Sequence, residues 1–301
     1  MYFTKGLYEM IRCIVSDMDG TLLNEMGKIS KANIEAIKDA RANGIDFVIA
    51  TGRAYIEAKH LLEEAGLTCP VLSINGAAVW DEKGDLVHSV PMDTRELKKA
   101  RAILDREGIL YEVFTNKGSY VKDIDVAIAA VVDIFMTAMP GLDPLLVTEK
   151  ARERYVDGYI HEVEDFDLLD REEGLEIYKI LAFSTDLSLL GKMGGELKEA
   201  TDLTVTSSGK ENLEITSLNA QKGIAVEAYV AKRNIALSET MALGDNFNDV
   251  SMFERVGRPV AMENAPAEIK DLCGEVTLSN MEDGVAAAIR KAIEQNKKET
   301  D

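Results

Sequence analysis

The sequence contains little of what several classes of protein require. Its 301 residues include only three cysteines, Cys13, Cys69 and Cys273, which are far apart and lack the spacing of a metal site. An odd number of scattered cysteines is typical of a reducing compartment, so we expect buried thiols and a cytoplasmic location. The three histidines are equally scattered and indicate no catalytic or metal-binding group.

Basic residues and long apolar runs are also scarce. The chain has 34 Lys and Arg against 53 Asp and Glu, a net charge of −19, which would repel a phosphate backbone and argues against nucleic acid as a partner. The most apolar stretch begins at Val126, carries Asp133 and breaks at Pro140, so it is too short to span a membrane. The first 13 residues lack the apolar core of a signal peptide. We therefore expect neither membrane association nor a secretory signal.

Short β-branched runs alternate with helical patterns in the first and last thirds of the chain. The runs are IRCIVSD (11–17), IDFVIAT (45–51), PVLSIN (70–75) and TMALGD (240–245). Helices are expected from a Ser30 cap to Gly44, over 54–65, over 222–233 and over 285–297. Strands that alternate with helices predict an α/β fold with a doubly wound, mostly parallel sheet.

The pattern changes after Trp80. A hairpin or connector (DEKGDLVHSVP) leads into a helix over about 94–107 and strands at 110–115 and 176–183. Another helix precedes a hairpin in 203–217, turning at Ser208-Gly209. This mixed α/β segment predicts an insertion at 86–212, so that residues 1–85 and 213–301 together build one core domain.

Polar residues follow several of the expected parallel strands. Asp17 and Asp19 follow the first strand, Thr51-Gly52-Arg53 the second and Gly244 to Asp249 the last, while Lys222 opens the helix before that strand. Because sites in open parallel sheets form at the carboxyl ends of strands, these residues are expected to meet at one edge. A simple turn is the alternative for Asp17 and Asp19, since Asp and Gly favour turns.

Carboxylates gathered at such an edge would repel one another strongly. A divalent cation relieves that repulsion, and hard oxygen ligands suit Mg²⁺. Lys222, Thr51 and backbone N–H groups would then hold a phosphoryl group. With phosphate held in this way, Asp17 is placed to attack phosphorus, and Asp19 to protonate the leaving oxygen and later activate water.

The ordered motifs resemble those of the haloacid-dehalogenase-like superfamily. They are DMDGT (17–21), TGR (51–53), Lys222 and GDNFNDVSM (244–252). NGA (75–77) and the mid-chain insertion are similar to the Cof-type sugar-phosphatase branch. The resemblance covers the chain after about Ile11 and implies a Rossmann-like parallel-sheet core with an inserted α/β cap domain.

The resemblance also implies a role for individual residues. The implied catalytic residues are Asp17, Asp19, Thr51 and Lys222. The implied substrate and phosphate contacts are Gly20, Gly52, Arg53, Asn75, Gly76 and Asn248. The implied metal ligands are Asp17, Asp245 and Asp249, together with the backbone carbonyl of Asp19.

Several of these residues also have an ordinary structural interpretation. Asp249 could simply cap the helix that follows it, Arg53 could pair with a surface acid, and Asn75 could be a turn residue. Lys179, in EIYKILAF, is interpreted as a surface lysine. Glu263 stands where the family often has glycine, which puts an extra carboxylate near the expected site.

The sequence predicts a magnesium-dependent hydrolase of small phosphomonoesters, with sugar phosphates favoured by the resemblance and a phosphorylated metabolite as partner. A phosphotransferase or sugar-phosphate mutase, as in the related phosphomannomutases, would use the same intermediate with another acceptor. A phospho-acceptor switch resembling a response-regulator receiver domain also uses a sheet-edge aspartate and magnesium. Receivers lack the mid-chain insertion and the second acid at Asp19, which argues against that third reading.

Overall fold

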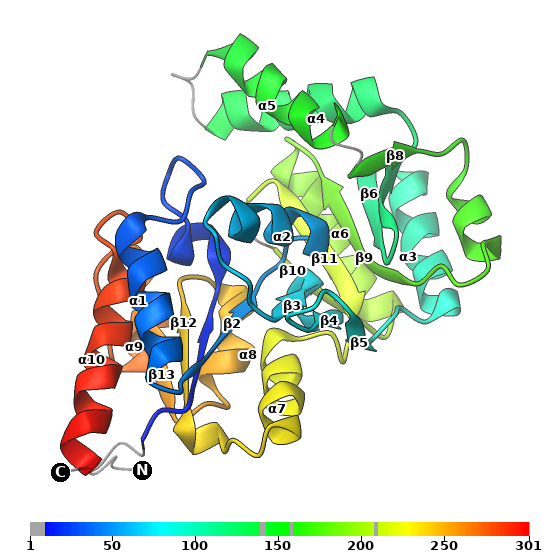
Figure 1. The fold of residues 1–301 in the computed structure, drawn as a ribbon. Coiled ribbons are helices and arrows are strands. Elements are labelled where there is room, and N and C mark those ends of the chain that lie inside the picture. Colours follow the sequence, from blue (N-terminus) through cyan, green and yellow to red (C-terminus); the bar gives the residue numbers. More distant parts are fainter. Residues whose placement is uncertain (1–9, 139–142, 157–158, 208–209, 301) are drawn as a thin grey trace. The chain divides into compact units, whose positions relative to one another are not determined.

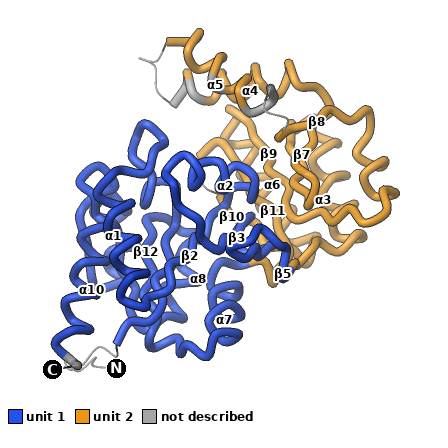
Figure 2. Tube along the Cα trace, in the orientation of Figure 1, with its two compact units in different colours: residues 1–88, 221–301 blue, residues 89–220 orange. Residues whose placement is uncertain are grey.

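The computed structural model describes residues 10–138, 143–156, 159–207 and 210–300. The chain forms two compact units, Met1–His88 with Gln221–Asp301 and Ser89–Ala220 (Figure 2). The first unit is therefore built from both ends of the chain, and the second is inserted between them. The sequence places the boundaries at 85/86 and 212/213, and the roles of hydrolase core and cap stay predictions.

The first unit contains a seven-stranded sheet with the order β13-β12-β1-β2-β3-β4-β5 (Figure 1). Its strands are β1 (Cys13–Ser16), β2 (Asp46–Ala50), β3 (Val71–Ser73), β4 (Ala78–Trp80), β5 (Leu86–Ser89), β12 (Thr240–Gly244) and β13 (Arg258–Ala261). The five strands from β13 to β3 are parallel, and β4 pairs antiparallel with β3.

Helices cover both faces of this sheet. They are α1 (Lys31–Ala42), α2 (Tyr55–Glu64), α7 (Lys222–Lys232), α8 (Val250–Phe253), α9 (Ala267–Cys273) and α10 (Gly284–Thr300). One apolar cluster joins α1, α2 and α10 to the sheet, and a second joins α7, α8 and α9 to the opposite face. The unit is thus a three-layer α/β/α sandwich, as the alternation of runs predicts.

Side-chain alternation explains why β1 suits the centre of this sandwich. Ile14 contributes to the first cluster, while Cys13 and Val15 contribute to the second, because successive side chains point to opposite faces of a strand. All four residues of β1 are buried, so the continuous apolar run is what a strand covered on both faces requires. Ser30 caps α1 as expected, accepting the N–H of Asn33 at 3.1 Å.

The second unit contains a six-stranded sheet with the order β10-β11-β9-β6-β7-β8. Its strands are β6 (Leu110–Thr115), β7 (Gly118–Val121), β8 (Ile160–Glu162), β9 (Ile177–Phe183), β10 (Leu203–Thr206) and β11 (Asn212–Ser217). Its helices are α3 (Thr94–Arg106), α4 (Ile124–Ala138), α5 (Pro144–Val156) and α6 (Leu187–Ala200). Helices α3 and α6 share one apolar cluster with the sheet, and α4 packs against α5.

The expected elements compare closely with the observed ones. The four expected parallel strands correspond to β1, β2, β3 and β12, and the expected hairpin corresponds to the antiparallel pair β10 and β11. Its predicted turn at Ser208-Gly209 lies outside the described residues, as does the expected break at Pro140. Strands β4, β7, β8 and β13 had not been expected; each spans three or four residues. Among the described residues, no helix is both long and apolar enough to cross a membrane.

A buried ion pair ties the edge of the first sheet to α10. Arg258 opens β13 with only 1% of its surface exposed. Its guanidinium donates to both carboxylate oxygens of Glu275, at 2.9 and 3.0 Å, and to Gln295 Oε1 at 2.7 Å. Lys291 also contacts Glu275, at 2.8 Å. Burial opposes ionisation of Glu275, but the two cations outweigh it and lower its pKa below 4.5.

Replacing Arg258 with methionine is expected to lower the free energy of unfolding at pH 7 by about 2–4 kcal/mol, because a half-buried carboxylate loses its main partner. Lys291→Met, which removes an exposed partner of the same carboxylate, should cost less than about 1 kcal/mol. The effect of Arg258→Met should shrink below pH 4.5, where Glu275 becomes protonated. Urea unfolding of both variants, at pH 7 and at the acidic pH, measures these free energies. Equal losses for Arg258→Met and Lys291→Met would contradict the assignment of Arg258 as the main partner of Glu275.

Candidate active site

Three aspartates from the ends of neighbouring strands meet at one edge of the first sheet. Asp17 follows β1, Asp245 follows β12, and Asp249 ends the short turn after Asp245. Strands β1 and β12 are adjacent and parallel, so their carboxyl ends lie at the same edge. One carboxylate oxygen from each aspartate lies within 4.8 Å of the others. The predicted convergence of Asp17 and Asp245 is therefore present in the structure.

Lys222 lies among these carboxylates. It is the first residue of α7, and its side chain has 0% exposed surface. Its ammonium contacts Asp17 Oδ1 at 2.6 Å and Asp249 Oδ1 at 2.7 Å. A buried lysine is tolerable only when it is paired, and here two carboxylates share one ammonium.

Backbone and hydroxyl donors hold two of the aspartates in place. Asp249 Oδ2 accepts the N–H groups of Asp245 and Asn246, at 3.0 and 3.1 Å. Thr21 donates its hydroxyl to Asp245 Oδ1 at 2.9 Å. Thr21 had not been assigned a role from the sequence, although it stands inside the DMDGT motif that drew attention to Asp17.

Two glycines allow the carboxylates to approach the backbone. A Cβ on Gly20 would overlap the carboxylate of Asp245, and a Cβ on Gly244 would overlap that of Asp249. Gly20 also has φ of 76°, which disfavours any side chain there. The sequence assigned Gly20 to substrate, and the structure places its Cα against Asp245.

Burial and mutual repulsion perturb the acids of this cluster. Burial, followed by the charges of Asp249, Asp245 and Asp19, raises the pKa of Asp17 well above 3.8, although Lys222 opposes the shift. Burial and the charge of Asp249 raise the pKa of Asp245 to about 6. Burial works against the charged form of Lys222, but its two carboxylate partners outweigh this and raise its pKa. The single ammonium thus compensates the three acids only in part.

Asp19 lies outside the carboxylate cluster. Its side chain is 56% exposed and forms a two-pronged ion pair with Arg53, from Nε at 2.7 Å and from the terminal nitrogen at 2.6 Å. The sequence left open whether Arg53 pairs with an acid or touches substrate. In the structure it pairs with an acid, and that acid is the predicted proton donor.

The remaining predicted residues lie after β2, β3 and β12. Thr51 is buried at the end of β2, and its hydroxyl accepts the N–H of Arg53, beyond Gly52, at 3.1 Å. Asn75 is buried after β3 and accepts the side-chain amide of Asn248 at 3.4 Å. Asn248 Oδ1 is buried with no hydrogen-bond partner in the described part of the chain. Since buried polar atoms are normally paired, that oxygen marks a place for a further polar group.

Two asparagines that the sequence had not singled out support the loop after Asp17. Asn264 donates its amide to the Gly20 carbonyl at 2.8 Å, and Asn280 donates its amide to the Leu23 carbonyl at 2.8 Å. Asn264 lies in the AMENA segment beside Glu263, and that segment was the available signal. Glu263 itself is exposed and pairs with Lys270 at 3.6 Å.

Comparison with known proteins identifies the family. A family model described as haloacid dehalogenase-like hydrolase matches residues 14–289. The chain belongs to this family. The resemblance that the motifs predicted, including the Cof-type branch, is therefore confirmed.

Relatives of this hydrolase match it over nearly their whole lengths. Phosphatase YwpJ of Bacillus subtilis (strain 168) is 35% identical over 94% of this chain and 100% of its own. From the same organism, 5-amino-6-(5-phospho-D-ribitylamino)uracil phosphatase YwtE is also 35% identical, over 94% and 98%. A solved haloacid dehalogenase-like hydrolase from B. subtilis is 34% identical with a TM-score of 0.84, covering 93% of this chain and 99% of that one. The chain is a phosphatase of this family.

In the inserted unit of this hydrolase, the interpretation of Lys179 as a surface residue is wrong. Lys179 is 3% exposed, its ammonium lies 3.4 Å from Glu214 Oε1, and it lies 4.2 Å from the centre of the Phe114 ring. Strand β9 is paired on both sides, with β6 and β11, so a side chain at its middle is flanked by neighbours on two strands. The local sequence around Lys179 did not reveal which strands would flank it.

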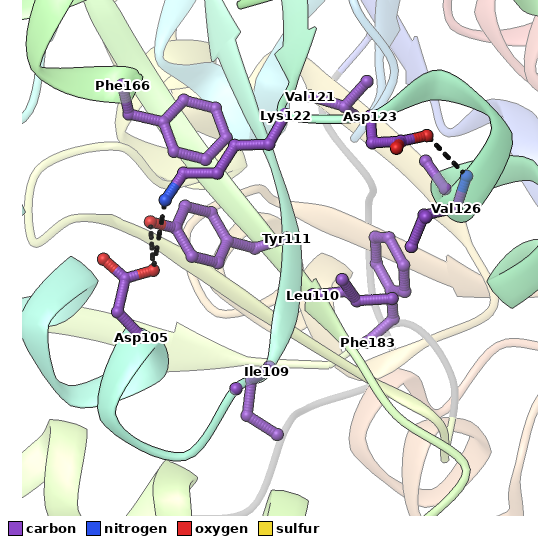
Figure 3. A pocket seen from close by; sticks show the side chains of 12 residues that line it. Asp105, Ile109, Leu110, Tyr111, Val121, Lys122, Asp123, Val126, Phe166 and Phe183 are labelled. Atoms are coloured by element: carbon purple, nitrogen blue, oxygen red, sulfur yellow. Dashed lines mark hydrogen bonds and ion pairs between the residues drawn. The ribbon is translucent and has the colours of Figure 1, made fainter. Parts of the chain in front are cut away.

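The inserted unit also contains a cavity of about 200 Å³ (Figure 3). Its walls are largely apolar, with Leu110, Phe166 and Phe183 among them. Its polar side chains already have partners, because Tyr111 donates to Asp105 at 3.0 Å, Lys122 lies 3.8 Å from the same carboxylate, and Asp123 accepts the Val126 N–H at 2.9 Å. The cavity therefore offers apolar surface rather than the chemistry of a phosphatase site.

The crowding of acids predicts that Asp245→Asn stabilises the metal-free protein at pH 7 by about 1–3 kcal/mol. The native state binds more protons than the unfolded state between pH 3.8 and about 6, so its stability falls as pH rises through that range. The advantage of the variant should therefore vanish near pH 4. Urea unfolding in the presence of EDTA measures the difference in stability between the variant and the wild type, with the exposed Asp39→Asn as the control variant. A variant no more stable than wild type at pH 7 would contradict the crowding argument.

Proposed function

We propose that this protein is a magnesium-dependent phosphatase that hydrolyses small phosphomonoesters through an aspartyl-phosphate on Asp17. The observation that carries the proposal is the Lys222 ammonium held between Asp17 and Asp249, with Asp245 in the same cluster. This arrangement joins a nucleophile, a cation for the phosphoryl oxygens and ligands for a metal. Its relatives are named phosphatases, which fits the same chemistry.

The acid cluster fits a bound magnesium ion. Three carboxylate oxygens within 4.8 Å of one another are hard ligands. Burial and mutual repulsion raise the pKa values of Asp17 and Asp245, so a bound cation would favour their ionised forms. Asp17 and Asp245 would bind the ion directly, with Asp249 and the backbone carbonyl of Asp19 as further ligands. When bound, the ion neutralises charge on the phosphoryl oxygens and the carboxylates.

In the first step Asp17 attacks phosphorus. Lys222 contacts Asp17 Oδ1, which favours Oδ2 as the attacking atom. The new Oδ2–P bond forms as the bond from phosphorus to the leaving oxygen breaks, and Asp19 gives its proton to that oxygen. Lys222 and Thr51 hold the phosphoryl oxygens as charge develops on them.

In the second step water attacks the aspartyl-phosphate. Asp19, now ionised, takes a proton from the water, and the Oδ2–P bond breaks to return the Asp17 carboxylate and release inorganic phosphate. Asp19 cannot donate a proton while it is paired in two places with Arg53. We therefore include an exchange in which the anionic phosphoryl group draws Arg53 away from Asp19.

The favoured substrates are phosphorylated sugars and sugar alcohols. One relative, 35% identical over 94% of this chain, is named for a substrate that carries its phosphate on a ribityl chain. The inserted unit Ser89–Ala220 would serve as the cap domain that selects the leaving group.

Phosphate release from a panel of phosphomonoesters tests this function. With Mg²⁺ present, 5-amino-6-(5-phospho-D-ribitylamino)uracil and hexose phosphates should be hydrolysed, and EDTA should stop the reaction. Asp17→Asn should lower kcat by at least about 10⁴-fold, since its amide is no nucleophile, while Asp39→Asn keeps full activity. Near-normal turnover by Asp17→Asn would remove Asp17 from the mechanism. Transfer of phosphate to an added sugar phosphate, rather than to water, would indicate a mutase.

Asp19→Asn should separate the two steps. With a sugar phosphate, kcat should fall by about 10²–10⁴-fold, because the leaving alkoxide needs a proton. With p-nitrophenyl phosphate the leaving group needs none, so rapid mixing should show one equivalent of nitrophenolate released quickly, followed by slow turnover. Absence of that burst, together with equal losses on both substrates, would contradict the proton-donor role.

A further inference from the structure

The residues on either side of Lys222 are both held by contacts that involve a glycine. On one side, Gly76 packs against Gln221, the residue that precedes Lys222. A Cβ built on Gly76 would lie 2.6 Å from the Gln221 carbonyl oxygen and 2.9 Å from the Cβ of Ala225. Real Cβ atoms do not approach that closely, so any side chain at position 76 would displace the first turn of α7.

On the other side, Gly223 packs against the backbone of α8. A Cβ on Gly223 would overlap the Ser251 carbonyl group, and the Gly223 N–H donates to the Ser251 hydroxyl at 3.0 Å. This hydrogen bond also satisfies one of the N–H groups that the start of a helix leaves without a partner in the helix. The first turn of α7 is therefore enclosed between the turn at 74–76 and Ser251.

The turn that carries Gly76 has an unusual backbone. Ile74, Asn75 and Gly76 have φ values of 51°, 55° and 90°, and a β-branched residue such as Ile74 rarely adopts positive φ. Two hydrogen bonds hold the turn, from the Ile74 N–H to the Arg53 carbonyl at 3.0 Å and from the Asn75 N–H to the Thr51 carbonyl at 2.9 Å. Such strain persists only where the surroundings impose it, and it is concentrated at functional sites.

The position of α7 matters because the Lys222 ammonium is closely held between two carboxylates. Its ammonium is buried and lies 2.6 Å from one carboxylate and 2.7 Å from another, so a small shift of the helix start lengthens one or both contacts. Misplacement of a catalytic group by about 1 Å can cost about 10²-fold in rate.

We propose that Gly76 and Gly223 are positioning residues that fix the Lys222 ammonium between Asp17 and Asp249. Their effect on catalysis rests on the proposed function, whereas their effect on the ammonium does not. Gly76, which the sequence assigned to substrate, acts in this proposal through Lys222. In this proposal neither glycine contacts the phosphoryl group.

Side-chain NMR of the lysine ammonium tests the geometry without any assay of activity. The buried Lys222 ammonium should give a slowly exchanging ¹H–¹⁵N signal, assigned by its loss in Lys222→Met. Gly76→Ala and Gly223→Ala should shift or abolish this signal. Gly66→Ala should keep it, because Gly66 also has positive φ, of 63°, but has nothing within 4 Å of its added Cβ. Gly195→Ala is the matching control for a helical glycine, and it too has open space.

Kinetics then test whether the glycines act through Lys222. Gly76→Ala and Gly223→Ala should lower kcat about 10²-fold, by the same factor for p-nitrophenyl phosphate and for sugar phosphates. In a Lys222→Met background the same substitutions should cost nothing further, since the group they position is gone. Should Gly76→Ala or Gly223→Ala fail to fold, Ser251→Ala keeps the test available, because it removes only the hydroxyl that accepts the Gly223 N–H. It should cause a smaller loss of kcat that also disappears in the Lys222→Met background.

An unchanged ammonium signal in both alanine variants would overturn the proposal. So would equal losses of kcat in the wild-type and Lys222→Met backgrounds, or a rise in KM confined to bulky substrates, which would place Gly76 against the substrate. If the alanine variants show the NMR shifts but the wild-type protein has no phosphatase activity, the proposed function is refuted and the positioning role stays intact.

Discussion

The site depends on a balance between three crowded carboxylates and one buried ammonium. Without Lys222, Asp17, Asp245 and Asp249 would place like charges within a few ångströms of one another in a region largely shielded from water. With it, the cluster still has more negative than positive charge, which suits it to take up a divalent cation. Folding and chemistry thus make opposite demands on these side chains, because the charge imbalance that is useful for binding a metal weakens the metal-free fold.

The surrounding fold is arranged to maintain this balance. Adjacent parallel strands bring Asp17 and Asp245 together, and backbone N–H groups hold Asp249. Glycines stand wherever a side chain would separate the backbone from these groups, at 20 and 244 beside the acids and at 76 and 223 beside the start of α7. The precision of the site therefore comes from backbone packing as much as from its charged side chains.

Much of the site could be predicted because its residues follow strands, and parallel topology alone brings the carboxyl ends of strands together. Strand topology alone therefore predicted that Asp17, Asp245 and Lys222 lie in one region. It could not show that Arg53 engages Asp19, that Ile74 adopts positive φ, or that Lys179 is buried. Each of these features depends on which distant segment of the chain packs beside the residue. Lys179 is buried because β9 lies between β6 and β11, and this strand order is not visible in the local pattern around Lys179.

The discontinuous sheet has a consequence for how the protein is made on the ribosome. Strand β1 pairs with β12, yet the whole of Ser89–Ala220 is synthesised between them. Until β12 emerges, one long side of β1 has no partner and presents unpaired backbone groups that attract other chains. The inserted unit has its own sheet and apolar cluster, so its core does not depend on β12. Nascent chains that end before residue 240 therefore carry an unpaired edge along β1, a feature that promotes aggregation.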